Sequence, residues 1–181
     1  MKKLIILMLA VLMVANIYGQ QDNVTANWKK DNTIELIMAN WYENLASYAE
    51  LHSMDDVIAT STDSAYVKLT DWTIGTYKNA TPDTTGNIIF TTAGVYRIAF
   101  SISFTHSVNL AICHVTAFKN STELTAIECE RKVRTGTDVG SMSASGLVTF
   151  AVGDTLQLRG KSGKDGNLTF YHSNFTIVRL R

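Results

Sequence analysis

The sequence predicts an all-β fold, an antiparallel β-sandwich, over roughly the last two-thirds of its 181 residues. From about Val57 onward, apolar residues tend to recur at every second position, as they do in strands with one buried face. These segments are short, and turn-forming residues separate them at regular intervals, which is typical of sandwiches and barrels. No stretch after His52 shows helical periodicity.

The clearest strand covers residues 95–104 and is expected at the centre of the core. One of its faces is almost wholly aromatic and β-branched, while the other is mostly small or polar. The only proline, Pro82, is expected in a loop. The other expected strands are residues 65–69, 88–91, 110–119, 123–133, 141–152, 155–159, 168–172 and 175–180.

The first 19 residues have the features of a secretory signal peptide. Lys2 and Lys3 precede an apolar run from Leu4 to Val14, and small and neutral residues follow as far as Gly19. This run is about half of the roughly 20 residues that a membrane-spanning helix needs. We therefore expect cleavage near Gly19, no stable membrane span in the mature chain, and a secreted or cell-surface protein. A retained membrane anchor is the alternative.

Residues 31–52 are predicted to form a helix, within a segment of residues 20–56 that precedes a sandwich domain of residues 57–181. The helix lacks Gly and Pro, and its apolar residues have the spacing of a coiled-coil seam. The seam residues are Ile34, Met38, Trp41, Leu45 and Tyr48. Because an isolated helix of this length is marginal in water, the seam must contact something. Three interpretations stay open: packing on its own sandwich, a short oligomerising stalk, or binding to a partner.

Composition and motifs argue against several classes of function. The chain carries 16 basic and 16 acidic residues, without a basic cluster, so it lacks the electrostatic features of a nucleic-acid-binding protein. It has no nucleophile elbow, no glycine loop with phosphate-binding spacing and no zinc-ligand pattern. We expect no cofactor, no metal ion and no enzymatic activity.

Two cysteines, Cys113 and Cys129, lie on two strands that are expected to form a hairpin. If residues 120–122 form its turn, antiparallel pairing centred on Ser121 places the two cysteines opposite each other. An exported protein encounters conditions that permit disulfides. A cross-strand disulfide is therefore predicted, with two buried free thiols as the alternative.

The same register places a histidine beside two carboxylates on the other face of the hairpin. His114 is expected opposite Glu128 and near Glu130. Such a group could bind a metal ion or perform acid–base chemistry. A salt-bridge cluster at the surface or in an interface is the commoner use of these residues.

The glycine-rich segment of residues 160–167 is the candidate binding loop. Its polar residues are Lys161, Lys164, Asp165 and Asn167. Exposed loops on a rigid scaffold often contact ligands, so one interpretation is a ligand-contacting tip. The other is a mobile turn without a binding role.

Three stretches of sequence, in this order, resemble the C1q/TNF-like jelly-roll family, specifically the C1q-type globular head. Residues 86–96 contain a strand ending in Phe, a tight turn and Gly-x-Tyr at the start of the next strand. Residues 144–158 contain a strand rich in small residues, then Val-Gly-Asp and an alternating apolar strand. Residues 173–180 contain Ser-x-Phe and an apolar end.

The resemblance implies a homotrimer of ten-stranded jelly rolls that presents loops to a partner and has no active site. The sequence lacks the Gly-x-y repeats of a collagen stalk, which argues against a complement-like architecture. We therefore expect a non-enzymatic, trimeric module for extracellular recognition or assembly, with an unidentified protein or glycan as its partner. One alternative is a phage virion component on the particle surface, such as a head fibre or tail-tip adhesin. A second is a carbohydrate-binding module or enzyme on the same sandwich.

Overall fold

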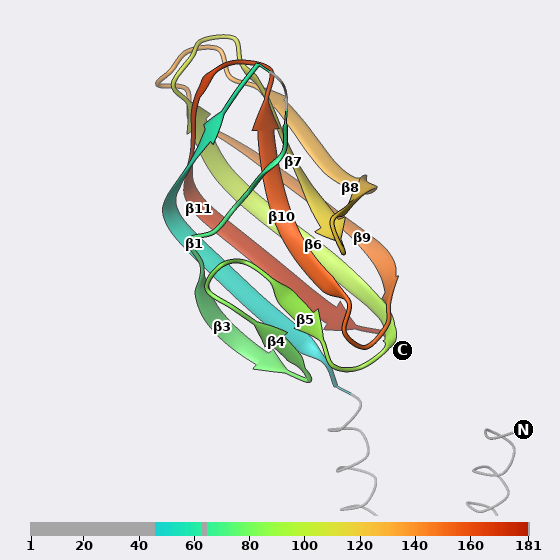
Figure 1. Cartoon of the computed structure of the whole chain (residues 1–181). Helices are drawn as coiled ribbons and strands as arrows, with labels where there is room; N and C mark the ends of the chain where they lie inside the picture. The colour runs from blue at the N-terminus through green and yellow to red at the C-terminus, as the bar shows by residue number, and fades with distance from the viewer. Residues whose placement is uncertain (1–45, 63–64, 181) are drawn as a thin grey trace, which may run out of the picture. The chain divides into compact units, whose positions relative to one another are not determined.

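A computed structural model describes residues 46–62 and 65–180. Regular structure in these residues is entirely β, as the sequence predicts for the part after residue 57, and they form two antiparallel sheets packed face to face (Figure 1). The strands are β1 (Tyr48–Thr60), β2 (Val67–Lys68), β3 (Thr73–Lys78), β4 (Ala80–Pro82), β5 (Ile88–Phe90), β6 (Gly94–His106), β7 (Ile112–Lys119), β8 (Thr122–Lys132), β9 (Gly140–Phe150), β10 (Thr155–Ser162) and β11 (Gly166–Arg179).

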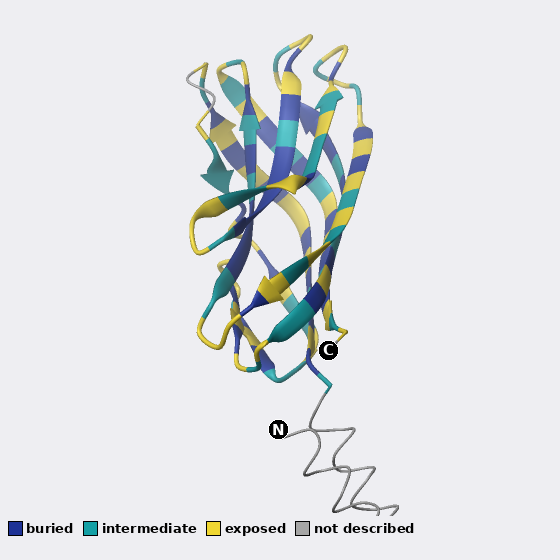
Figure 2. Cartoon of the chain, turned by 90° about the vertical axis from the view of Figure 1, so that its right-hand side faces the viewer, coloured by how far each residue is buried: buried dark blue, intermediate teal, exposed yellow. Residues whose placement is uncertain are grey.

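Sheet A has the strand order β3-β1-β11-β6-β9, and sheet B has the order β4-β5-β10-β7-β8, with β2 paired to β10. Buried and exposed residues alternate along many of the strands (Figure 2), because one face of each sheet packs against the other sheet. In β6 the inward residues Tyr96, Ile98 and Phe104 are completely buried. The predicted central strand of the core is thus confirmed.

An aromatic cluster joins the two sheets at one end of β6. The ring of Phe90 in sheet B stacks on Phe150 in sheet A, with 3.8 Å between ring centroids. Tyr96 packs edge-on against Phe90 at 4.6 Å. The Tyr96 hydroxyl lies 2.7 Å from the Thr92 carbonyl oxygen and 2.9 Å from Ser47 Oγ, so its burial leaves no polar atom unpaired.

The last strand differs from the prediction. Residues 168–172 and 175–180 are expected as two strands, but β11 continues without a break from Gly166 to Arg179. Ser173 pairs with Ser53 of β1 and with Ile102 of β6. Because β11 pairs with a strand on each side, it stays extended at these polar residues, although their polarity predicts a break in the strand.

The predicted end of the N-terminal helix and the predicted domain boundary at residue 57 are both wrong. β1 begins at Tyr48 and runs through the boundary to Thr60, paired with β11 along its length. Of the coiled-coil seam, only Tyr48 is described, and it is a strand residue. The other four seam residues and the signal peptide lie outside the described residues.

The sequence of β1 does not alternate clearly between apolar and polar residues, because apolar residues occupy some of its outward positions. Met54 and Val57 are 62% and 52% exposed, while the inward Ser53 is polar and buried. β3 and β4 also lack a signal in the sequence, and Pro82 ends β4 instead of lying in a loop. Since β4 is an edge strand of sheet B, the missing N–H of a proline is tolerated there.

We predict that Gly86→Ala lowers the free energy of unfolding by about 2 kcal/mol or more. Gly86 has a φ of 81°, and an added Cβ would lie 2.6 Å from the Leu69 carbonyl oxygen and 2.5 Å from Trp72 Nε1. Gly163→Ala is the matched control, because an added Cβ there meets nothing within 4 Å. Chemical denaturation measures both variants, and equal stabilities would contradict this explanation.

Candidate functional site

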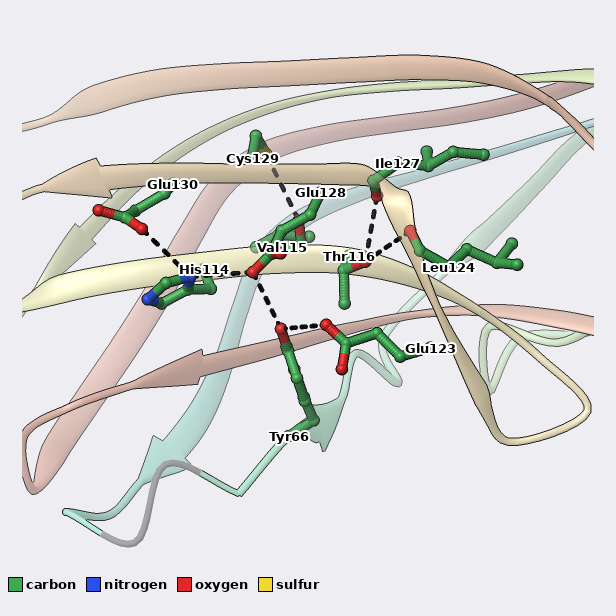
Figure 3. A network of polar contacts seen from close by, with 10 residues as sticks. All are labelled: Tyr66, His114, Val115, Thr116, Glu123, Leu124, Ile127, Glu128, Cys129 and Glu130. Atoms are coloured by element: carbon green, nitrogen blue, oxygen red, sulfur yellow. Dashed lines mark hydrogen bonds and ion pairs between the residues drawn. The ribbon is translucent and has the colours of Figure 1, made fainter.

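A polar network covers the outer face of sheet B, and Tyr66 is at its centre. Tyr66 directly precedes β2, and its ring extends across the sheet toward β8 (Figure 3). The Tyr66 hydroxyl lies 2.8 Å from Glu123 Oε1 and 3.0 Å from Glu128 Oε1. Burial and these two carboxylates raise the pKa of Tyr66 well above its ordinary value. The neutral tyrosine therefore keeps two acidic residues of β8 in place.

His114 extends this network along β7. Its Nδ1 lies 2.9 Å from Glu128 Oε1 and 3.7 Å from Glu130 Oε2. The residue directly opposite His114 is Glu130, not Glu128 as the predicted register has it. Within residues 46–62 and 65–180, no group of three or more His, Cys, Asp or Glu side chains is placed to hold a metal ion. The cluster is a hydrogen-bonded network in which Glu128 contacts both Tyr66 and His114.

Two cation–π contacts complete this cover. Lys161 Nζ lies 4.1 Å from the centroid of the Tyr66 ring. The Arg159 guanidinium lies 4.3 Å from the centroid of the Phe118 ring, and Tyr66 packs edge-on against the same ring at 5.1 Å. Phe118 is therefore only 6% exposed, although it is outside the core cluster between the sheets. The middle of this face is closed by its own side chains.

The outer face of sheet A has no such cover. The outward positions of β6 and β9 carry mainly small side chains, namely Ala99, Ser101, Ser103, Ser141, Ser143 and Ser145. Around them, Met54, Val57, Leu147 and Val178 are between 49% and 62% exposed. On the outward positions of β1, β6, β9 and β11, the charged residues are Glu50 and Arg97, and the exposed Asp55 of β1 has a positive φ of 60°. The face is broad, nearly uncharged and partly apolar.

A hollow lies in the outer face of sheet A, where the small side chains leave space. His52 and Met54 of β1, His172 and Asn174 of β11, and Ser101 and Ser103 of β6 are among its lining residues. Two histidines thus lie at the centre of a face with few charges. The sequence gives no hint of this, because these residues are distant in the chain and the strand carrying His52 is itself not predicted.

The predicted binding loop is distributed over three structural elements. Lys161 belongs to β10 and Asn167 to β11, so only Lys164 and Asp165 lie in the turn between them. Lys164 Nζ donates a hydrogen bond to the Asn109 carbonyl oxygen, and Asp165 Oδ1 accepts one from the Thr62 N–H. These side chains tie neighbouring loops together. Whether the loop contacts a ligand stays a prediction.

A buried histidine fixes the same end of the sandwich. His106 is fully buried, and its Nδ1 accepts a hydrogen bond from the Val108 N–H at 3.0 Å. Its Nε2 therefore carries the proton and donates to Thr60 Oγ1, also at 3.0 Å. The Thr60 hydroxyl in turn lies 3.0 Å from the Lys164 carbonyl oxygen. Burial lowers the pKa of His106, so the neutral ring is favoured.

The predicted disulfide is absent, because the hairpin has a different register. Asn120 and Ser121 form a two-residue turn with positive φ angles of 48° and 68°. A bulge between Thr116 and Phe118 then shifts the strands so that Cys129 lies opposite Val115. Cys113 lies opposite Arg131, so the two cysteines are diagonal neighbours and both are free thiols.

Comparison with solved structures identifies the architecture. Eiger TNF from S. frugiperda matches with a TM-score of 0.53 and 14% identity, over 75% of this chain and 94% of that one. Murine APRIL, crystallised at pH 5.0, matches with a TM-score of 0.52 and 15% identity, over 74% of this chain and 99% of that one. The fold is a TNF-like jelly roll. The jelly roll predicted from the sequence motifs is therefore confirmed.

The other two comparisons find no relative. No family model matches the sequence, and no curated protein matches it. The likeness to known structures therefore concerns the fold. Among the described residues, no helix is long and apolar enough to cross a membrane.

We predict that an alkylating reagent modifies neither thiol in the native protein. After unfolding, both thiols react with it, and no reductant is needed. Burial raises the pKa of Cys113 to about 11 and that of Cys129 to about 12, so little reactive thiolate exists at pH 8. Intact-mass analysis after alkylation checks this. A denatured, unreduced chain that takes up no label would instead indicate a disulfide.

We predict that Tyr66→Phe lowers the free energy of unfolding by about 1–2 kcal/mol. The change removes the hydroxyl between Glu123 and Glu128 and leaves the two carboxylates without their shared donor. Tyr77→Phe is the control, since Tyr77 is 56% exposed. Thermal and chemical denaturation at pH 7 compare the two variants, and an unchanged Tyr66→Phe protein would show that the network contributes nothing to stability.

Proposed function

We propose that this chain is a non-enzymatic, homotrimeric module that is secreted and recognises a protein or glycan partner outside the cell. The TNF-like fold supports this proposal, and so do the signal-like features of residues 1–19. The observation that carries it is the difference between the two outer faces of the sandwich.

The outer face of sheet A is suited to burial against another copy of the chain. Its central side chains are small, so another surface approaches the sheet closely. Its exposed apolar residues, such as Met54 and Leu147, gain from leaving water. Few charges lose hydration when this face is covered, and charged residues are depleted at the centres of interfaces generally.

The composition of β1 supports the same conclusion. A strand with water on one side alternates between apolar and polar residues, whereas a strand buried on both sides carries apolar residues on both. β1 exposes Met54 and Val57 while burying Leu51 and Ile58. The outward Met54 and Val57 therefore favour an arrangement in which this part of β1 is also covered in the assembled protein.

The resemblance to the C1q/TNF-like family supports an assembly of three copies, and closed rotational symmetry would give each copy the same environment. Several equivalent sites on one particle would also strengthen binding to a repeated partner through avidity.

The end that carries the Thr60–His106 contact is held by hydrogen bonds between loops. Because loops on a scaffold often contact ligands, this loop-built end is the surface that we assign to the partner.

We predict that Ser143→Arg disrupts self-association of the full-length protein. Ser143 is exposed on the outer face of sheet A, and an unpaired arginine buried in an interface raises the dissociation constant about a hundredfold or more. Sedimentation velocity at micromolar concentration compares the variant with the unchanged protein.

Thr125→Arg, at an exposed position of β8 in sheet B, is the matched control and should leave the assembly intact. If the unchanged protein sediments as a single protomer, self-association is wrong. If Ser143→Arg still forms the trimer, a different surface is responsible.

A further inference from the structure

His52 and His172 lie on adjacent strands and both face outward from sheet A. Met54 pairs with His172, and His52 pairs with Asn174, so the two imidazoles occupy neighbouring rows of one face. Both histidines are exposed, and both line the hollow described above. In the described part of the chain, neither has a hydrogen bond or ion pair with another side chain.

Apart from the two histidines, the residues that line the hollow are uncharged, and β3, which pairs with the other side of β1, places the uncharged Thr73 opposite His52. β6 contributes Ser101 and Ser103, β9 contributes Ser141, and β11 contributes Asn174. Of the charged residues on these strands, Glu50 is held by Asn174 Nδ2, which donates to its Oε1 at 3.0 Å. Asp55 directly follows Met54 in β1 and has a positive φ of 60°, and Arg97 lies on β6 toward the opposite end from the hollow. No carboxylate in the described residues makes an ion pair with either imidazole.

We infer that His52 and His172 make self-association through the outer face of sheet A dependent on pH, so that a second copy covers the hollow at neutral pH and leaves it in acid. The inference rests on the proposed function, because it concerns the same face.

The direction follows from the cost of burying charge. Histidine is the side chain that ordinarily changes charge between pH 5 and 8. Burying a neutral imidazole in the interface costs little free energy. Burying an imidazolium without a carboxylate partner costs much more, because its lost hydration is not replaced by an ion pair. A protomer therefore binds protons more readily when free than when assembled. Acid shifts the equilibrium toward free protomers, and a trimer concentrates six such histidines in its contacts.

The test measures the assembly of the full-length protein at pH 7.5 and at pH 5.5 by sedimentation velocity. We expect the dissociation constant to rise at least tenfold at pH 5.5. A difference of one pKa unit at a single histidine, between the free and the assembled protomer, corresponds to a tenfold change in this constant. The double variant His52→Gln, His172→Gln should assemble equally at both values. His114→Gln is the matched control, because His114 lies on sheet B and the variant should keep the response to pH.

Circular dichroism at pH 5.5 confirms that the protomer stays folded, which is needed because protonation of the buried His106 also favours unfolding. A protein that is a single protomer at pH 7.5 contradicts the proposed function itself. A protein that assembles equally at both pH values overturns only the inference. The inference is also wrong if the double variant still dissociates in acid.

Discussion

The contact between Phe90, Tyr96 and Phe150 is the interaction on which the sandwich depends. Phe90 comes from sheet B and the other two from sheet A, and their rings pack within 6 Å of one another. This contact joins the two sheets at one end of the sandwich, and at the other end the buried His106–Thr60 hydrogen bond joins β6 and β1 within sheet A. The surface chemistry then depends on what the two outer faces carry.

Those outer faces have opposite characters. On sheet B, Tyr66 extends over the strands, where its hydroxyl bonds to Glu123 and Glu128 and its ring contacts Lys161. The same ring packs against Phe118 and helps to bury it. On sheet A, the outward side chains are small or apolar, and the hollow between them contains two histidines. A face that is covered by its own side chains needs no partner. For an open and nearly uncharged face, coverage by another surface lowers the free energy.

The errors of sequence-based prediction have a common physical cause. Local alternation finds a strand only when one side is apolar and the other polar, as in β6. It fails for β1, whose outward Met54 and Val57 are apolar, and it places a break in β11, whose pairing with two neighbours is not visible locally. The disulfide prediction fails because a bulge at Thr116 changes the register by an amount that no residue pattern specifies.

By itself, the sequence determined the class of fold, most of the strands of the sandwich and the motif residues that meet in its core, because these depend on alternation and turn chemistry within short segments. Only the tertiary structure decided which residues share a face. It separated Cys113 from Cys129, brought Tyr66 to Glu123 and Glu128, and placed His52 beside His172. Strand order and register determine such neighbours, and both arise from contacts between segments far apart in the chain.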